Sequence, residues 1–147
     1  MKKLIVRAAI QIRRPVDVVF DSIIDPQKMA QYFISESTGR LEEGKQIFWK
    51  WPEFPEYPCP VDHIKIDPYR SVSFIWGNDT MVRIDLEEQI DKSVVVRVAE
   101  GEKEPNEAGL KWYGDNTEGW ANFLASMKAF LEYGINLRAG AFDFMRK

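Results

Sequence analysis

The clearest pattern in the chain is a stretch near its C-terminal end where hydrophobic residues recur at steps of three and four. The residues with this spacing are Trp120, Phe123, Leu124, Met127, Phe130 and Leu131. The opposite face carries Asn122, Ser126, Lys128 and Glu132. This division into an apolar and a polar face is typical of an amphipathic helix. We therefore predict one long helix over residues 115–135, with its apolar face buried.

The beginning of the chain predicts a strand followed by two short helices. Residues 4–13 alternate between apolar and polar positions, which is typical of a β-strand with one buried face. Helical spacing follows over residues 16–24 and again over residues 26–33. Asp25-Pro26 separates the two helices, because the residue before a proline avoids the helical region.

The middle of the chain alternates with a period of two and is interrupted by turn residues. The expected strands cover residues 35–41, 46–51, 61–66, 71–76, 82–87 and 94–98. Tight turns between successive strands imply an antiparallel meander. Residues 101–106 are expected to form a polar loop. Lys111-Trp112-Tyr113-Gly114 would then be either a lid over a cavity mouth or an ordinary entry loop of the long helix.

This order of elements predicts an α+β helix-grip fold. In that fold, a curved antiparallel sheet of about six to seven strands wraps around a long C-terminal helix, and two short helices follow the first strand. We expect residues 1–147 to form a single domain, because the length is that of one ordinary domain.

Composition and charge exclude several classes of function. Hydrophobic residues make up 45% and charged residues 29%, which is typical of a soluble globular protein. The net charge is −3 and no basic tract stands out, so we expect no nucleic-acid partner. Arg7 interrupts the apolar run that a signal peptide would need, and no stretch is apolar and long enough to span a membrane. The expected location is the cytoplasm.

Reactive side chains are few. His63 is the only histidine, and strand alternation turns it toward solvent, away from Ile64 and Ile66. Cys59 is the only cysteine and lies in a proline-rich stretch without a helix N-terminus to activate it. One cysteine and one histidine cannot supply the ligands of a zinc site. The carboxylates, including Glu102 to Glu107, are expected on solvated turns and faces. We therefore predict no catalytic residues, no metal and no cofactor.

Aromatic side chains form the strongest candidate site. They are expected to gather where the sheet faces the long helix, either as ordinary core packing or as the wall of a pocket. Ligand pockets are mostly apolar and aromatic with few polar groups. The candidate ligand-binding residues are Trp49, Trp51, Phe74, Trp76, Trp120, Phe123 and Met127.

Three segments resemble one known group of proteins. "IQIRRPVDVVFDSIIDPQKMAQYF" and "VDHIKIDPYRSVSFIW" resemble the first strand and helices, and a later strand–turn–strand, of the START-like (SRPBCC, birch-allergen-like) superfamily. "EGWANFLASMKAFLEYG" is similar to the helix of its branch related to the C-terminal domain of the heat-shock protein 90 ATPase activator. The resemblance covers nearly the whole chain. The chain departs from the pattern at Tyr32-Phe33, where a tryptophan is common, and in the proline-rich residues 51–60.

The resemblance implies a fold and a cavity, but it does not imply one chemistry. The leading hypothesis is non-enzymatic binding of a small hydrophobic molecule between the sheet and the long helix. One alternative is an interaction module like the activator domain, with a protein partner or a second copy of the chain. The other is a polyketide-cyclase-like enzyme, which would need paired polar residues inside the cavity.

Overall fold

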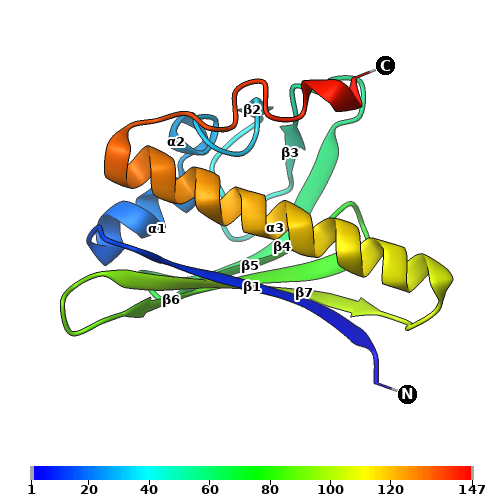
Figure 1. Ribbon diagram of the computed structural model, residues 1–147, viewed down its shortest axis with the longest axis horizontal. Helices are drawn as coiled ribbons and strands as arrows, with labels where there is room; N and C mark the ends of the chain where they lie inside the picture. The colour runs from blue at the N-terminus through cyan, green and yellow to red at the C-terminus, as the bar shows by residue number, and fades with distance from the viewer. Residues whose placement is uncertain (1, 147) are drawn as a thin grey trace.

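A curved antiparallel sheet and one long helix lying across it make up most of the molecule (Figure 1). The computed structural model describes residues 2–146. The strands are β1 (Leu4–Ile12), β2 (Glu36–Ser37), β3 (Ile47–Lys50), β4 (Cys59–Asp67), β5 (Ser71–Trp76), β6 (Thr80–Glu88) and β7 (Val94–Lys103). The helices are α1 (Val16–Ile24), α2 (Pro26–Met29), α3 (Glu107–Tyr133) and the short 3-10 helix η1 (Asp143–Met145). The strands lie in the order β1-β7-β6-β5-β4-β3-β2, which confirms the predicted helix-grip fold.

The core fills the space between α3 and the sheet. Strand alternation turns Val94, Val96 and Val98 of β7 inward, and all three are buried. The buried residues of α3 include Trp120, Phe123, Leu124 and Met127, as the three-four spacing predicts. Phe130 and Leu131 are only partly buried against this core. Truncating a fully buried residue such as Leu124 to alanine is expected to cost about 2–5 kcal/mol.

The long helix begins earlier than the sequence analysis predicted. It starts at Glu107, because the Asn106 side chain accepts a hydrogen bond from the Gly109 backbone N–H at 2.8 Å and caps the first turn. Lys111-Trp112-Tyr113-Gly114 therefore lies within α3, and the predictions of a loop or a lid there are wrong. Residues 101–103 belong to β7 rather than to a loop, since the strand pairs with β1 as far as Lys103.

Two other local predictions need correction. Cys59 is the first residue of β4, not part of a loop. The strand expected over residues 35–41 is limited to the two residues of β2. By contrast, the side chain of His63 is 71% exposed, as alternation predicts, and its ring contacts Asp62 at 2.8 Å. A bulge between Asp62 and Lys65 shifts the register of β4 against β5 at this point.

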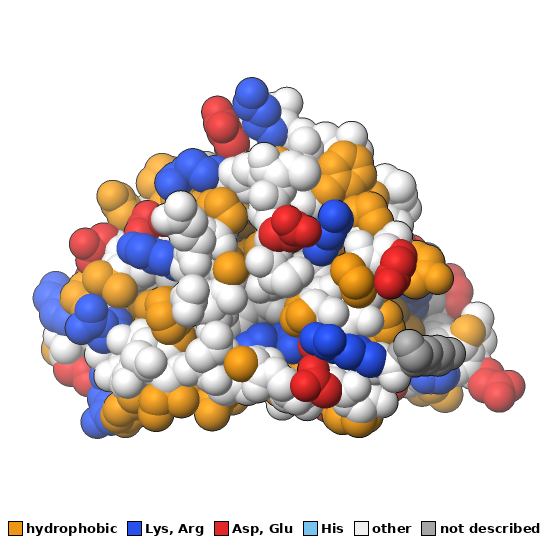
Figure 2. Space-filling view, turned by 90° about the horizontal axis from the view of Figure 1, so that it is seen from above, with side chains coloured by type: hydrophobic (Ala, Val, Ile, Leu, Met, Phe, Trp, Pro, Cys, Tyr) orange, Lys and Arg blue, Asp and Glu red, His pale blue; other side chains and the backbone are white. Residues whose placement is uncertain are grey.

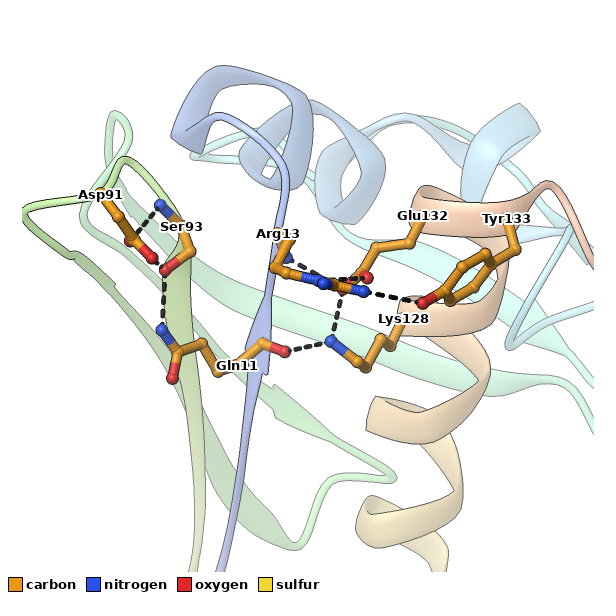
Figure 3. Close-up of polar contacts among 7 residues, drawn as sticks. All are labelled: Gln11, Arg13, Asp91, Ser93, Lys128, Glu132 and Tyr133. Atoms are coloured by element: carbon orange, nitrogen blue, oxygen red, sulfur yellow. Dashed lines mark hydrogen bonds and ion pairs between the residues drawn. The ribbon is translucent and has the colours of Figure 1, made fainter.

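A polar network fastens the last turn of α3 to the end of β1 (Figure 3). The Glu132 carboxylate accepts hydrogen bonds from the Arg13 backbone N–H at 2.9 Å and from Arg13 Nε at 3.1 Å. Lys128 also donates to Glu132, and to the Gln11 carbonyl at 2.7 Å. Burial opposes ionisation of Glu132, but these donors outweigh it and lower its pKa to about 2. Gly134 then ends the helix in the left-handed conformation, with φ 66°.

Candidate functional site

Beyond α3, residues 134–146, here called the C-terminal segment, turn back over the helix toward β3 (Figure 1). Arg138 anchors this segment. Its guanidinium donates two hydrogen bonds to the Glu53 carboxylate, at 2.9 and 2.6 Å, and one to the Phe33 carbonyl at 3.1 Å. Both Arg138 and Glu53 are buried. The hydrogen bonds from Arg138 lower the pKa of Glu53, so the pair stays ionised and holds the segment against the loop after β3.

A cavity of about 490 Å³ lies between α3, the C-terminal segment and the loop after β3; we call it the tail cavity. Its volume falls within the range of about 300–1,000 Å³ that is usual for small-molecule pockets. It is lined by Tyr32, Phe33, Trp51, Glu53, Phe54, Lys111, Asp115, Glu118, Gly119, Asn122, Phe123, Ser126, Arg138, Phe142 and Met145. On this side of the molecule, hydrophobic side chains are scattered among charged ones (Figure 2).

The two sides of the tail cavity differ in chemistry. On α3, Glu118, Asn122 and Ser126 recur at steps of four, so one stripe of the helix presents polar groups to the cavity. Gly119 adds room within this stripe, because a Cβ there would meet no atom within 4 Å. The opposing wall is aromatic, with Phe33 and Trp51. The cavity therefore combines a large apolar surface with a few hydrogen-bonding groups.

Phe33 lies at the centre of the aromatic cluster behind this wall. Ring centroids of Trp49, Trp51, Trp76, Trp120 and Phe123 lie between 4.6 and 6.5 Å from that of Phe33. Most of these pairs are edge-on or tilted, the arrangements that aromatic rings favour. The sequence analysis did not include Phe33 among the ligand-binding candidates, because it placed the residue at the end of a short helix.

A second cavity, of about 310 Å³, lies beside β6, β7 and the first turns of α3; we call it the Glu100 cavity. It is lined by Trp51, Cys59, Trp76, Gly77, Asp79, Thr80, Glu100, Trp112 and Asn116. Trp51 lines both cavities. Burial raises the pKa of the Cys59 thiol, so this side chain is protonated and unsuited to nucleophilic attack.

Glu100 is buried, with 1% of its surface exposed, and its carboxylate accepts four hydrogen bonds. One oxygen accepts from Asn116 Nδ2 and Trp120 Nε1, each at 2.8 Å. The other accepts from Trp76 Nε1 at 2.8 Å and from the Thr80 hydroxyl. All four donors are neutral. The ion pairs formed within residues 2–146 do not include Glu100.

Comparison with known proteins identifies the family. Residues 13–132 match the sequence model of the family described as activator of Hsp90 ATPase homolog 1-like protein. The chain belongs to this family. The match confirms the resemblance to START-like proteins that the sequence motifs indicated. No curated protein matches the chain.

Several solved structures share this fold. The protein SSP2350 from Staphylococcus saprophyticus is 25% identical, with a TM-score of 0.80 over 92% of this chain and 96% of that one. The Aha1 dimer from Colwellia psychrerythraea is 18% identical, with a TM-score of 0.75 over 89% and 98% of the two chains. DynU16, a putative protein in the dynemicin biosynthetic locus, is 22% identical, with a TM-score of 0.76. The match covers 91% of this chain and 49% of DynU16. The likeness to the last two shows the fold alone.

The candidate residues occupy different places in this activator-like fold. Trp51 and Phe123 line the tail cavity, and Trp51 and Trp76 line the Glu100 cavity. The remaining candidates are buried in the core and line neither cavity: Trp49, Phe74, Trp120 and Met127. The tail cavity lies beside α3 rather than between α3 and the sheet, where buried side chains occupy the space.

Sequence reasoning also missed the polar groups of both cavities. Glu100 follows Val96 and Val98 in the inward-facing register of β7, so extending the alternation by one more step would have placed it in the core. No local pattern indicated the Glu53–Arg138 pair, because its members lie far apart in the chain.

The described residues show neither a metal site nor a membrane helix. Residues 2–146 contain no group of three or more His, Cys, Asp or Glu side chains placed to hold a metal ion. Within the same residues, every helix is too short or too polar to cross a bilayer.

Proposed function

We propose that the protein binds a small, largely hydrophobic molecule in the tail cavity, without changing it chemically. The observation that carries this proposal is a cavity of about 490 Å³ with an aromatic wall, closed on one side by the buried Glu53–Arg138 pair. Burial of apolar ligand surface against Phe33, Trp51 and Phe123 supplies the driving force, at about 25 cal/mol per Å².

The polar stripe of α3 defines the kind of ligand. Asn122 and Ser126 offer an amide and a hydroxyl to the cavity, which suit one carbonyl or hydroxyl group on an otherwise apolar molecule. Glu53 is paired with Arg138, and Lys111 is paired with Asp115 at 2.7 Å. Glu53 and Lys111 are therefore engaged within the chain rather than with a ligand.

Filling the cavity tests this proposal. Gly119→Leu places a branched side chain in the tail cavity, whereas Gly114→Leu makes the same change on α3 outside both cavities. A panel of fatty acids, flavonoids and an environment-sensitive apolar dye is titrated into each protein. Tryptophan emission and thermal shift report binding, because Trp51 forms part of the wall.

We expect wild type and Gly114→Leu to bind at least one compound class with similar affinity, and Gly119→Leu to bind about tenfold or more weakly. Equal binding by wild type and Gly119→Leu would exclude the tail cavity as the site. If no compound binds wild type, the hydrophobic-ligand proposal fails. Mass spectrometry of the recovered compound separates binding from turnover, and a changed mass would favour the polyketide-cyclase-like alternative.

A protein-interaction role is the second candidate. The name of the family and the description of the Colwellia psychrerythraea protein as a dimer support it. Light scattering over a range of concentrations measures self-association directly. A mass that stays at that of one chain would exclude a homodimer, and the interaction proposal would then require a different protein as partner.

A further inference from the structure

We propose that the Glu100 cavity binds an organic cation, a quaternary ammonium or methylated amine group, against the faces of Trp51, Trp76 and Trp112. This site shares Trp51 with the tail cavity but does not depend on the function proposed for that cavity. Three features of the cavity lead to this inference: its aromatic lining, its buried negative charge, and an ammonium group already bound at its rim.

The lining supplies three indole rings. Trp51 is the first residue after β3, Trp76 is the last residue of β5, and Trp112 comes from the first turns of α3. The rings of Trp51 and Trp76 pack edge to face, at 67° with centroids 6.0 Å apart, and Trp76 also stacks against Trp120 with centroids 5.1 Å apart. Of the aromatic side chains, tryptophan attracts cations most strongly over its face. Several such walls around one cavity are the arrangement that quaternary ammonium groups favour.

Glu100 places a negative charge behind these walls. The indole N–H groups of Trp76 and Trp120 can only donate hydrogen bonds, and together with the Asn116 amide they use both Glu100 oxygens as acceptors. These three donors and the Thr80 hydroxyl occupy the Glu100 oxygens, so a ligand would not form hydrogen bonds to Glu100 in their place. The charge instead attracts a cation through the poorly screened interior. The hydrogen bond from Trp76 also polarises that indole and makes its face more negative.

The rim of the cavity already holds an ammonium group from the chain itself. Lys103 Nζ lies 2.5 Å from Asp79 Oδ2 and 5.9 Å from the ring centroid of Trp112. Asp79 and Trp112 both line the cavity, whereas Lys103 does not. The site therefore attracts a cation at its edge by the two interactions proposed for the ligand, a carboxylate and an indole face.

The size and lining select the kind of cation. A volume of about 310 Å³ accommodates a trimethylammonium head group, and the two carboxylates of the lining are already engaged, Asp79 by Lys103 and Glu100 by four hydrogen-bond donors. A methylated ammonium spreads its charge over methyl groups that pack against indole rings. It therefore gains from the tryptophans both electrostatic attraction and burial of apolar surface.

The experiment compares charged and neutral probes of the same shape. Full-length protein is titrated with choline, with tetramethylammonium, and with 3,3-dimethylbutan-1-ol, the neutral isostere of choline. Indole N–H signals in ¹H–¹⁵N NMR spectra report binding tryptophan by tryptophan. We expect both cations to shift the Trp76 and Trp112 signals, and the neutral alcohol to bind about tenfold more weakly.

Two variants and one control probe the site without changing the buried carboxylate. Trp112→Leu should weaken choline binding severalfold, while Tyr113→Leu, the neighbouring change outside both cavities, should leave it unchanged. Lys103→Met should strengthen choline binding, because it removes the competing ammonium from Asp79 and Trp112. Equal binding of choline and its neutral isostere would overturn the proposal. Absence of binding by wild type, or an unchanged affinity in Trp112→Leu, would overturn it as well.

Discussion

Two carboxylates with little exposed surface contact α3, one from its own last turn and one from β7, and their surroundings differ. At the C-terminal end, the side chain of Glu132 is 4% exposed and contacts the cations Arg13 and Lys128 (Figure 3). Glu100 of β7 faces the middle of α3, is 1% exposed, and contacts only neutral donors, among them Asn116 and Trp120. The first charge is balanced within the chain, and the second is not.

This difference distinguishes a carboxylate that stabilises the fold from one that belongs to a candidate binding site. Glu132 lines neither cavity, and its contacts tie α3 to β1. Glu100 lines a cavity, and four hydrogen bonds stabilise its charge without neutralising it. A buried carboxylate paired with cations therefore contributes to holding the fold together. One that is solvated only by dipoles keeps an electrostatic field that an external cation can use.

The largest effect is expected from Glu100→Leu. The substitution leaves the buried Trp120 indole N–H and the Asn116 amide without their acceptor, while Trp76 Nε1 keeps only its 3.2 Å hydrogen bond to the Thr80 hydroxyl. Each donor left in this way costs about 1–3 kcal/mol, so the free energy of unfolding should fall by about 3 kcal/mol or more. Urea denaturation at neutral pH measures the change. A loss below about 1 kcal/mol would mean that water readily replaces the carboxylate, and that Glu100 is not a buried charge.

Asn116 and Trp120, two of the donors to Glu100, lie on α3, and Gly109 is tightly packed in the first turn of this helix. A Cβ at Gly109 would lie 1.8 Å from the Glu104 carbonyl oxygen, so Gly109→Ala forces the first turn to move. We expect a loss of about 1–3 kcal/mol in thermal or urea denaturation. Gly114→Ala is the matched control, since a Cβ there meets nothing within 4 Å; it should stabilise the protein by about 0.5–1 kcal/mol. Similar effects of the two changes would contradict this packing.

Glu132→Gln tests how much the pairing of the Glu132 carboxylate with Arg13 and Lys128 stabilises the fold. Because the pKa of Glu132 falls from 4.5 to about 2 on folding, its contribution is present above pH 4.5 and is lost as the pH falls toward 2. Solvent screens the largely exposed Arg13, so we expect a loss of about 1–2 kcal/mol at pH 7. Urea denaturation of wild type and variant at pH 7 and pH 3 measures this loss in the free energy of unfolding. The difference between them should shrink at pH 3, and a constant difference would show that the cations do not stabilise this carboxylate.

The smallest change in stability is expected at His63, whose ring contacts Asp62 and neither of the two carboxylates compared above. His63→Asn changes an exposed side chain at the bulge of β4, where φ is 50°, a conformation that asparagine tolerates. We expect the stability to change by less than about 0.5 kcal/mol, and ligand binding to stay the same. Parallel thermal denaturation and binding titrations check both expectations. A loss of binding with unchanged stability would give His63 a functional role.

Sequence periodicity predicted the fold because burial repeats regularly in strands and helices. The buried positions of Leu124 and Val98 follow from steps of four and two along the chain. The start of α3 was missed because Gly109 and Gly114 are typical of loops, whereas the cap from Asn106 and open space around Gly114 permit a helix. Glu100 was missed because a carboxylate is normally a surface residue.

The tail cavity was beyond prediction for a different reason. It depends on Arg138 reaching Glu53 and the Phe33 carbonyl, contacts between segments that share no periodic pattern. Only the tertiary arrangement brings the C-terminal segment against α3. The sequence therefore indicated that aromatic residues gather, but it gave no signal for where their packing leaves room.

The sheet order has a consequence for synthesis on the ribosome. β1 is made first, yet it pairs only with β7 (Val94–Lys103) and is fastened at its end by the last turn of α3. At about 5–20 residues per second, roughly 5–20 s pass before β7 emerges. During that time β2 to β6 can pair in chain order, while β1 exposes an unpaired apolar face. The first strand to be translated is thus among the last to be incorporated, and the nascent chain is most open to aggregation there.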